Sequence, residues 1–420
     1  AMTSWDKVSQ IDASHFDKNT AYLAINAIRK DDMTPYVYRT RDGGKTWDLL
    51  NKGMNPIGPV NVVREDPKQK GLLFAGTERE VYFSIDDGEN WQSIRNNMPA
   101  TSIRDLVIHE DDLVVGTHGR SAWIMDHISP LREMAKSKAA KVYLYGPDDT
   151  YRVRWNMFSD TPLPPEEPTG ENPPDGATLD YQLNQSARLV QLEILNSDGS
   201  LIRRYRSDDP EEARDTLSYA YPTYWMRPLQ KLGTSVGHHR FVWDLRYTAP
   251  RGADRDFSIA AVYKNTPSGP HGPFVNPGTY RVRLTVDGQS FERAVTVKMD
   301  PRVTISPEAL NDQFNLSMAC YNAYHELQVM VEAIDSKKNA SDGLKKLRGN
   351  GAVGDPDTMY GSITHVPAEN ETLVGLQNKF LFMQNLLQAG DVAPTTQTLN
   401  ALETLKQTLA GVKARYAKLK

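Results

Sequence analysis

The chain has 420 residues, of which 39% are hydrophobic and 24% charged, a composition typical of a globular protein with about two to four domains. A net charge of −4 gives no general attraction to nucleic acid or to an anionic membrane. No apolar run reaches the roughly 20 residues that a membrane span needs. The single cysteine, Cys320, excludes an internal disulfide, and its apolar helical surroundings predict a buried, unreactive thiol.

Two eight-residue segments in the first 130 residues repeat a common pattern, Ser/Thr-x-Asp-x-Gly-x-Thr/Asn-Trp. The pattern predicts a hairpin turn in which the aspartate accepts backbone N–H groups, the glycine takes a positive φ and the tryptophan buries its ring. Both tryptophans are therefore expected to be buried. The residues that carry the pattern are Thr40, Asp42, Gly44 and Trp47 in the first copy and Ser84, Asp86, Gly88 and Trp91 in the second.

A strand pattern is interleaved with these turns. Leu72–Thr77 is echoed by Leu113–Thr117, and Ala21–Asn26 occupies the same place in an earlier copy. Several short strands in each unit of about 40 to 50 residues are typical of β-propeller blades. We therefore predict that residues 1–130 form a partial propeller of about three blades, the third without the aspartate pattern.

These repeats resemble the Asp-box (BNR) repeats of sialidases, of xyloglucan-cleaving tandem-propeller glycosidases and of the sortilin family. The runs Gly71–Thr77 and Asp111–Arg120 look most similar to large bacterial sortilin-like or BNR-repeat glycosyl hydrolase proteins. The resemblance implies a C-terminal portion of such a protein, secreted or periplasmic, that acts on or binds glycans. A non-catalytic sortilin-like scaffold for peptide or glycan ligands is the alternative. Because the box lies at the blade periphery in these families, it implies a structural role for Asp42 and Asp86.

Residues 131–300 are predicted to form an immunoglobulin-like or fibronectin-like β-sandwich with long loop insertions. Apolar alternation around a turn predicts hairpins at 189–205 and at 280–297. Further strands are expected at 141–145 and 241–245. Stretches rich in proline, glycine and acidic residues predict long loops at 157–177 and 248–276.

Residues 301–420 are predicted to form a three-helix bundle. Ser306 and Pro307 read as the N-cap and first residue of a helix. Apolar residues then recur at spacings of three and four in three segments, as expected for the core of antiparallel helices. The glycine-rich stretch 348–367 is predicted to be a mobile loop.

Three arginines lie at similar offsets beyond three equivalent strands: Arg29, Arg79 and Arg120. In a propeller these positions face one end of the channel, where guanidinium groups bind a carboxylate bidentately. Glu78 and His118 complete the predicted ligand-binding set. A merely solvated surface is the alternative for the arginines.

Motifs for cofactors and metals are missing from the sequence, including the phosphate-binding loop and the zinc-protease helix, so no cofactor or metal is predicted. His238 and His239 are adjacent and, in a strand, point to opposite faces. Glycoside hydrolysis needs a pair of carboxylates. Asp31, Asp32 and Glu78 are possible contributors, but nothing in the sequence pairs them, so catalysis stays open.

An aromatic stretch, Tyr219–Trp225, is suited either to stacking on sugar rings or, as we favour, to packing between domains.

The number of predicted blades implies that the repeats have a partner. Three blades do not close a propeller, which typically uses about four to eight. We therefore expect N-terminal blades, on the same precursor or on a second chain, or self-association, to cover the open faces.

Overall fold

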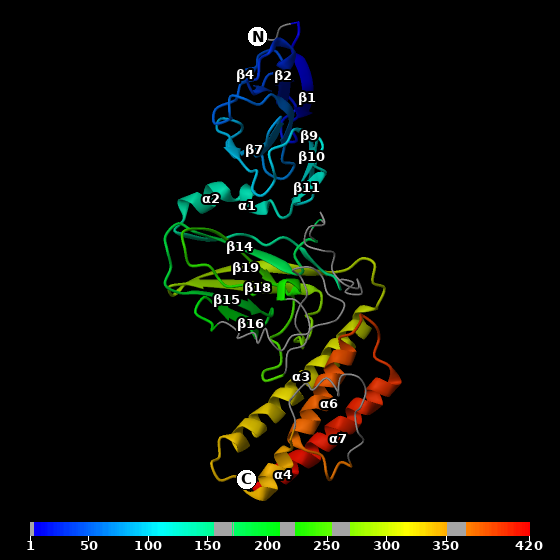
Figure 1. The fold of residues 1–420 in the computed structure, drawn as a ribbon. Helices are drawn as coiled ribbons and strands as arrows, with labels where there is room; N and C mark the ends of the chain where they lie inside the picture. Colours follow the sequence, from blue (N-terminus) through cyan, green and yellow to red (C-terminus); the bar gives the residue numbers. More distant parts are fainter. Residues whose placement is uncertain (1–3, 155–169, 171, 211–222, 254–268, 351–366) are drawn as a thin grey trace. The chain divides into compact units, whose positions relative to one another are not determined.

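The computed structural model describes residues 4–154, 170, 172–210, 223–253, 269–350 and 367–420 (Figure 1). The fold is mainly β, with several sheets followed by helices. The chain divides into two compact units. The first unit holds residues 1–148, 180–186 and 235–239, and the second holds the rest. The division into three domains at about residues 130 and 300 stays a prediction.

Three sheets follow one another in the first unit, and in each the strands pair with their neighbours in the chain. The first repeat sheet contains β1 (Lys7–Ala13), β2 (Ala21–Asn26), β3 (Tyr36–Thr40) and β4 (Asp48–Leu49). The second contains β5 (Val60–Glu65), β6 (Leu73–Thr77), β7 (Val81–Ser84) and β8 (Gln92–Ser93). The third contains β9 (Ile103–His109), β10 (Asp112–Thr117) and β11 (Ala122–Met125). Repeated antiparallel sheets are thus confirmed, while their membership of a propeller ring stays a prediction.

Apolar side chains pack between successive repeat sheets. Tyr22 and Val37 of the first sheet share one buried cluster with Leu73 and Trp91 of the second. The second and third sheets approach closely at Gly76, where an added Cβ would lie 2.5 Å from Cγ2 of Ile103. The recurring glycine of the strand pattern therefore has a steric reason at this position.

The prediction that both motif tryptophans are buried is right for Trp91, which is 3% exposed, and wrong for Trp47, which is 36% exposed. The indole N–H of Trp91 donates to the carbonyl of Leu50, in the segment that leaves the first sheet. The indole N–H of Trp47 turns back to the carbonyl of Gly44 in its own turn. Trp47 is exposed because the described residues put no neighbouring sheet over it.

Two short helices that the sequence did not reveal follow the third repeat sheet: α1 (Ser129–Arg132) and α2 (Met134–Ala139). Arg132 ties α1 back to the second repeat sheet, since its Nη2 lies 2.9 Å from Oδ2 of Asp66, whose side chain is fully buried. Arg132 also pairs with Asp111, beside β10. The guanidinium of Arg132 thus supplies hydrogen-bond donors to two carboxylates at the point where the chain leaves the repeats.

Two further sheets follow the repeats. β12 (Val142–Leu144), β14 (Ala177–Leu183) and β17 (Gly237–Trp243) form a three-stranded sheet. The second unit contains a five-stranded sheet in the order β13 (Thr150–Arg152), β19 (Gln289–Met299), β18 (Gly278–Val286), β15 (Val190–Leu195), β16 (Leu201–Arg206). Both predicted hairpins are confirmed. The parallel pairing of β13 with β19 was not predicted, and the immunoglobulin-like sandwich stays a prediction.

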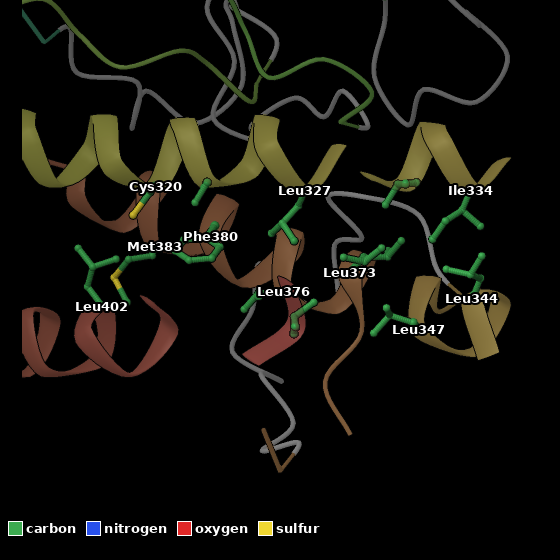
Figure 2. Packing of buried hydrophobic residues seen from close by; sticks show 14 of the residues in the cluster. Cys320, Leu327, Ile334, Leu344, Leu347, Leu373, Leu376, Phe380, Met383 and Leu402 are labelled. Carbon is green, nitrogen blue, oxygen red and sulfur yellow. The ribbon is translucent and has the colours of Figure 1, made fainter. Parts of the chain in front are cut away.

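The helical region contains α3 (Pro307–Asp335), α4 (Asp342–Arg348), α6 (Leu373–Leu387) and α7 (Thr396–Leu419). The predicted N-cap is confirmed, since Oγ of Ser306 accepts the backbone N–H of Ala309. Figure 2 shows the buried residues that join these helices, including Cys320, Phe380 and Leu402. Burial raises the pKa of the Cys320 thiol to about 12, so it is an inert core group. Because α4 adds a fourth described helix, a strict three-helix bundle stays a prediction.

Several expectations fall wholly or largely outside the described residues. They are the loops at 157–177, 248–276 and 348–367 and most of the aromatic stretch 219–225, of which only a 3₁₀ turn at Thr223–Trp225 is described.

Candidate functional site

The strands β2, β6 and β10 occupy the same place in the three repeat sheets, and a polar turn follows each of them. Oγ1 of Thr77 accepts the backbone N–H groups of Arg79 and Glu80. Oγ1 of Thr117 accepts the N–H of Arg120 in the same way. We call these turns, with the residues they contact at the starts of β5 and β9, the rim.

A chain of hydrogen bonds connects the three sheets at the rim. Nδ2 of Asn26 donates to Oδ1 of Asn61 at 3.0 Å, and Nδ2 of Asn61 donates to Oε1 of Glu78 at 3.0 Å. The same amide donates to the carbonyl of Ile103 at 3.0 Å. Asn26 and Asn61 are both buried. Because their donors and acceptors are matched, the position of the Glu78 carboxylate is fixed before any ligand arrives.

Glu78 is held as a carboxylate. Burial raises its pKa, but contacts with the Ser102 hydroxyl and the Asn61 amide, together with the charge of Arg104, outweigh burial and leave the pKa below its usual value. Nη1 of Arg104 lies 3.2 Å from Oε1 of Glu78. The side chain is 23% exposed, so this ionised acceptor remains open to solvent. A group of this kind accepts hydrogen bonds rather than donating a proton.

His118 and Arg79 lie on either side of the segment that enters β9. The N–H of Thr101 donates to the carbonyl of Arg79 at 3.1 Å, and the N–H of His118 donates to the carbonyl of Ser102 at 2.9 Å. The side chains of His118 and Arg79 are exposed. The structure therefore brings together three of the five predicted ligand-binding residues: Glu78, Arg79 and His118.

Arg29 and Arg120 lie at the corresponding turns of the first and third repeat sheets. Arg29 belongs to the 3₁₀ turn η1 (Ile28–Lys30) directly after β2, and Arg120 precedes β11. Both side chains are exposed. That these guanidinium groups act together with Arg79 on one carboxylate stays a prediction.

Of the three carboxylates that the sequence singled out, Asp32 has a role within its own turn. Oδ1 of Asp32 accepts the N–H of Thr34, Oδ2 accepts the hydroxyl of Tyr36, and these bonds lower its pKa. Asp31 is exposed and has a φ of 59° at the end of the 3₁₀ turn. Only Glu78 belongs to the rim's hydrogen-bond chain.

Sequence reasoning missed Asn26, Asn61 and Arg104. A signal for Asn61 was present, since it is the single polar residue in the apolar run Val60–Val63. A buried amide within such a strand needs partners on both its donor and acceptor atoms, and so indicates a network. Asn26 and Arg104 carried no comparable signal.

The two aspartate turns form nearly the same hydrogen bonds. Oδ1 of Asp42 accepts the N–H of Thr46 and Oδ2 accepts its hydroxyl, while Asp86 accepts the N–H and side-chain amide of Asn90. In each turn a hydroxyl, from Thr40 or Ser84, also donates to the carboxylate. These are the contacts that a structural role for the aspartates requires.

The turn hydrogen bonds keep both aspartates ionised. The backbone N–H and the hydroxyl of Thr46 lower the pKa of Asp42 to about 2. For Asp86, burial raises the pKa, but the bonds from Asn90 and Ser84 outweigh it and lower the pKa. Asp42 and Asp86 therefore stabilise their turns in the charged form.

The adjacent histidines take different partners. Nε2 of His238 lies 3.3 Å from Oδ1 of Asp180, and the ring of His239 stacks on Tyr181 at 5.0 Å between centroids. Within the described part of the chain, no group of three or more histidine, cysteine, aspartate or glutamate side chains is placed to hold a metal ion.

Comparison with known proteins found no matching family model and no matching curated protein. Among solved structures, the chain is similar to YCF48 bound to D1 peptide, with 13% identity over 47% of this chain and 52% of that chain and a TM-score of 0.21. It is similar to the GH74 enzyme of Niastella koreensis, with 13% identity over 42% and 26% of the two chains and a TM-score of 0.24. An ancestral GH74 enzyme matches at 12% identity over 69% and 35%, with a TM-score of 0.25.

The chain thus spans about half of the YCF48 chain and about a quarter of the Niastella enzyme. At these TM-scores the likeness carries no argument about function, which rests on the chain's own residues. None of the helices in the described ranges combines the length and the apolar character needed to cross a membrane.

Proposed function

We propose that this chain is the C-terminal portion of an Asp-box propeller protein that is secreted or periplasmic, and that its rim binds a glycan. The observation that carries the proposal is the Glu78 carboxylate, fixed by Asn61 and Arg104 and ionised at neutral pH. An ionised carboxylate beside neutral amides accepts hydrogen bonds from sugar hydroxyls. Because its geometry is set in advance, little conformational entropy is lost when a ligand binds.

Arg79 and Arg120 favour a glycan that carries an acidic group. Both are exposed at equivalent turns of neighbouring sheets. Guanidinium binds carboxylates and sulfates through two parallel hydrogen bonds, which supplies orientation as well as affinity. Neutral hydroxyls of the same ligand then face Glu78.

The charge state of Glu78 suits binding, or the base or nucleophile of a glycosidase, but not the acid of a glycosidase. A glycosidase acid must hold its proton near neutral pH, which requires a raised pKa. The surroundings of Glu78 lower its pKa instead. Any cleavage at the rim would then need its proton donor from another residue.

The proposal is tested by screening the 420-residue chain on a glycan array and measuring the best ligand by calorimetry. We expect Glu78→Gln and Arg79→Ala each to weaken binding about tenfold or more, since each removes a charge-assisted hydrogen bond. Lys45→Ala, an exposed change in the Thr40–Trp47 turn, is the matched control and should bind normally. Unchanged affinity in both rim variants would refute the proposal. Loss of a measurable glycan-cleaving activity in Glu78→Gln would replace binding by catalysis.

The first repeat sheet also carries exposed apolar side chains suited to a further sheet. Ile11 is 61% exposed, Leu49 47% and Trp47 36%. Exposed apolar groups gathered on one sheet are typical of an interface. The proposed occupant is another repeat sheet, from the same precursor, a second chain or a second copy. Light scattering on the isolated chain tests self-association, and a stable monomer would exclude the second-copy form.

A further inference from the structure

Three arginines of the second unit surround one phenylalanine ring. The guanidinium carbon of Arg246 lies 3.7 Å from the ring centroid of Phe274, and those of Arg152 and Arg154 each lie 5.0 Å from it. Arg152 ends β13 and Arg154 follows it, while Arg246 and Phe274 form an isolated β-bridge. Cation–π attraction favours these positions, but it does not cancel the repulsion between three like charges.

Among the described residues, a single carboxylate pairs directly with this arginine cluster. Nη2 of Arg152 donates to Oδ1 of Asp391 at 2.8 Å, and Nε of Arg154 lies 3.0 Å from the same oxygen without a directed hydrogen bond. Arg154 also donates to the carbonyl of Gln388, and Arg246 to that of Gly272. These carbonyls satisfy individual N–H groups, but they carry no charge.

The neighbouring acids are already paired with other arginines. Nη1 of Arg203 donates to both carboxylate oxygens of Asp244, at 2.9 and 3.0 Å. Nη2 of Arg227 donates to Asp175 at 2.8 Å. Asp244 and Asp175 also favour the charged form of Arg246, but each is paired with another arginine. Among the described residues of this group, five arginines stand against three aspartates, which leaves an excess of two positive charges.

Several N–H groups of the cluster are buried and lack a hydrogen-bond partner within the described part of the chain. They are Nε and Nη1 of Arg152 and Nε and Nη2 of Arg154. Arg152 is only 1% exposed, and the Arg154 side chain is 21% exposed, although its unpaired nitrogens are themselves buried. A buried, unpaired guanidinium donor is costly, so these groups indicate an acceptor that carries negative charge.

Burial also acts on the protonation of the cluster. Burial, the largest cause, lowers the pKa of Arg152 to about 10 and that of Arg246 to about 9. Neighbouring arginine charges act in the same direction, while Asp391 and Asp244 oppose them. Both guanidinium groups remain charged at neutral pH. An anion close to them would relieve the penalty by favouring the charged form.

We propose that Arg152 and Arg154 bind a small oxyanion group, either a phosphate or sulfate or the carboxylate of a larger ligand. The free N–H groups match the paired oxygens of such groups, and two excess positive charges favour a monoanion or dianion. This site lies in the second unit and does not depend on glycan binding at the rim.

The proposal is tested by thermal unfolding and calorimetry of the whole chain with sodium sulfate, sodium phosphate and sodium acetate, against sodium chloride at equal ionic strength. We expect a saturable rise of a few °C in Tm with at least one oxyanion. Methyl phosphate and glucuronate distinguish a free ion from a group on a larger ligand. Arg154→Met should abolish the saturable rise. Arg302→Met, which removes an exposed arginine paired with Asp300, should keep it.

Two results would overturn the proposed oxyanion site. If chloride stabilises the protein as much as the oxyanions do, or if Arg154→Met responds like the unchanged protein, the site does not bind oxyanions. Circular dichroism establishes that Arg154→Met is folded. Should it not fold, Arg154→Lys keeps one charge but loses the paired donors, and we expect it to weaken oxyanion binding about tenfold. Unchanged affinity in Arg154→Lys would also overturn the proposal.

Discussion

The turns Thr40–Trp47 and Ser84–Trp91 share a sequence pattern and nearly the same internal hydrogen bonds, yet their tryptophans differ in burial. Trp91 is 3% exposed and Trp47 is 36% exposed. Trp91 is covered by the segment around Leu50 and Gly53 of the preceding repeat sheet. The local motif thus determines the turn, whereas the adjacent sheet determines whether the indole is buried.

The difference in burial between Trp91 and Trp47 distinguishes two contributions to stability, contacts within a turn and contacts between sheets. Contacts within a turn form wherever the motif occurs, because all the partners lie within eight residues. Contacts between sheets depend on a neighbour supplied from elsewhere, and they bury far more apolar area. Paired substitutions in the two turns measure the two contributions separately.

The largest difference is expected for the tryptophans. We expect Trp91→Ala to lower the free energy of unfolding by about 3–5 kcal/mol, because it leaves a cavity between two sheets. Trp47→Ala should cost less than about 1 kcal/mol, as for other partly exposed positions. Urea unfolding followed by circular dichroism measures both. Equal losses would mean that the sheet-to-sheet packing is not as described.

A smaller difference is expected for two glycines with positive φ. Gly53 has a φ of 93°, and an added Cβ would lie 2.4 Å from the carbonyl oxygen of Trp91. Gly43 has a φ of 72°, with nothing within 4 Å of such a Cβ. Gly43→Ala should cost roughly 1 kcal/mol from backbone strain alone, and Gly53→Ala about 1–3 kcal/mol more from overpacking. Urea unfolding compares the two variants. Equal losses in the free energy of unfolding would contradict the close contact at Gly53.

The smallest expected effect is the loss of stability at low pH when Asp42 becomes protonated. The pKa of Asp42 is lowered to about 2, so its stabilising contribution is fully present above its unfolded value of about 4. That contribution is lost as the pH falls through about 2. We expect Asp42→Asn to lower Tm by a few °C at pH 6, with the difference closing between about pH 4 and pH 2. A pH-independent difference in Tm would contradict the assigned hydrogen bonds.

Features with local signals were predicted well from the sequence. The hairpins at 189–205 and 280–297 have turn residues between alternating strands, and α3 has a serine cap followed by proline. Each signal lies within a few residues of the structure that it specifies, so a single sequence contains it. The same holds for the aspartate turns.

Features that depend on distant partners were not predicted. β13 is three residues long and pairs with β19, which begins at Gln289. The arginine cluster joins Arg152 to Asp391, and the rim joins Asn26 to Asn61. Nothing local distinguishes such residues from solvated ones, because their roles depend on how the sheets meet. Only Asn61, a polar residue inside an apolar strand, offered a hint.

The charge state of Glu78 carries the proposed binding role, and it is tested most directly by the pKa of Glu78, measured by carbon-detected NMR titration of its side-chain carboxyl. We expect a pKa below the usual value of about 4.3 for glutamate. Arg104→Met should raise this pKa, because the substitution removes the nearby positive charge. A pKa raised toward neutrality would contradict the ionised carboxylate on which the proposed binding role rests, since Glu78 would then be a proton donor suited to catalysis.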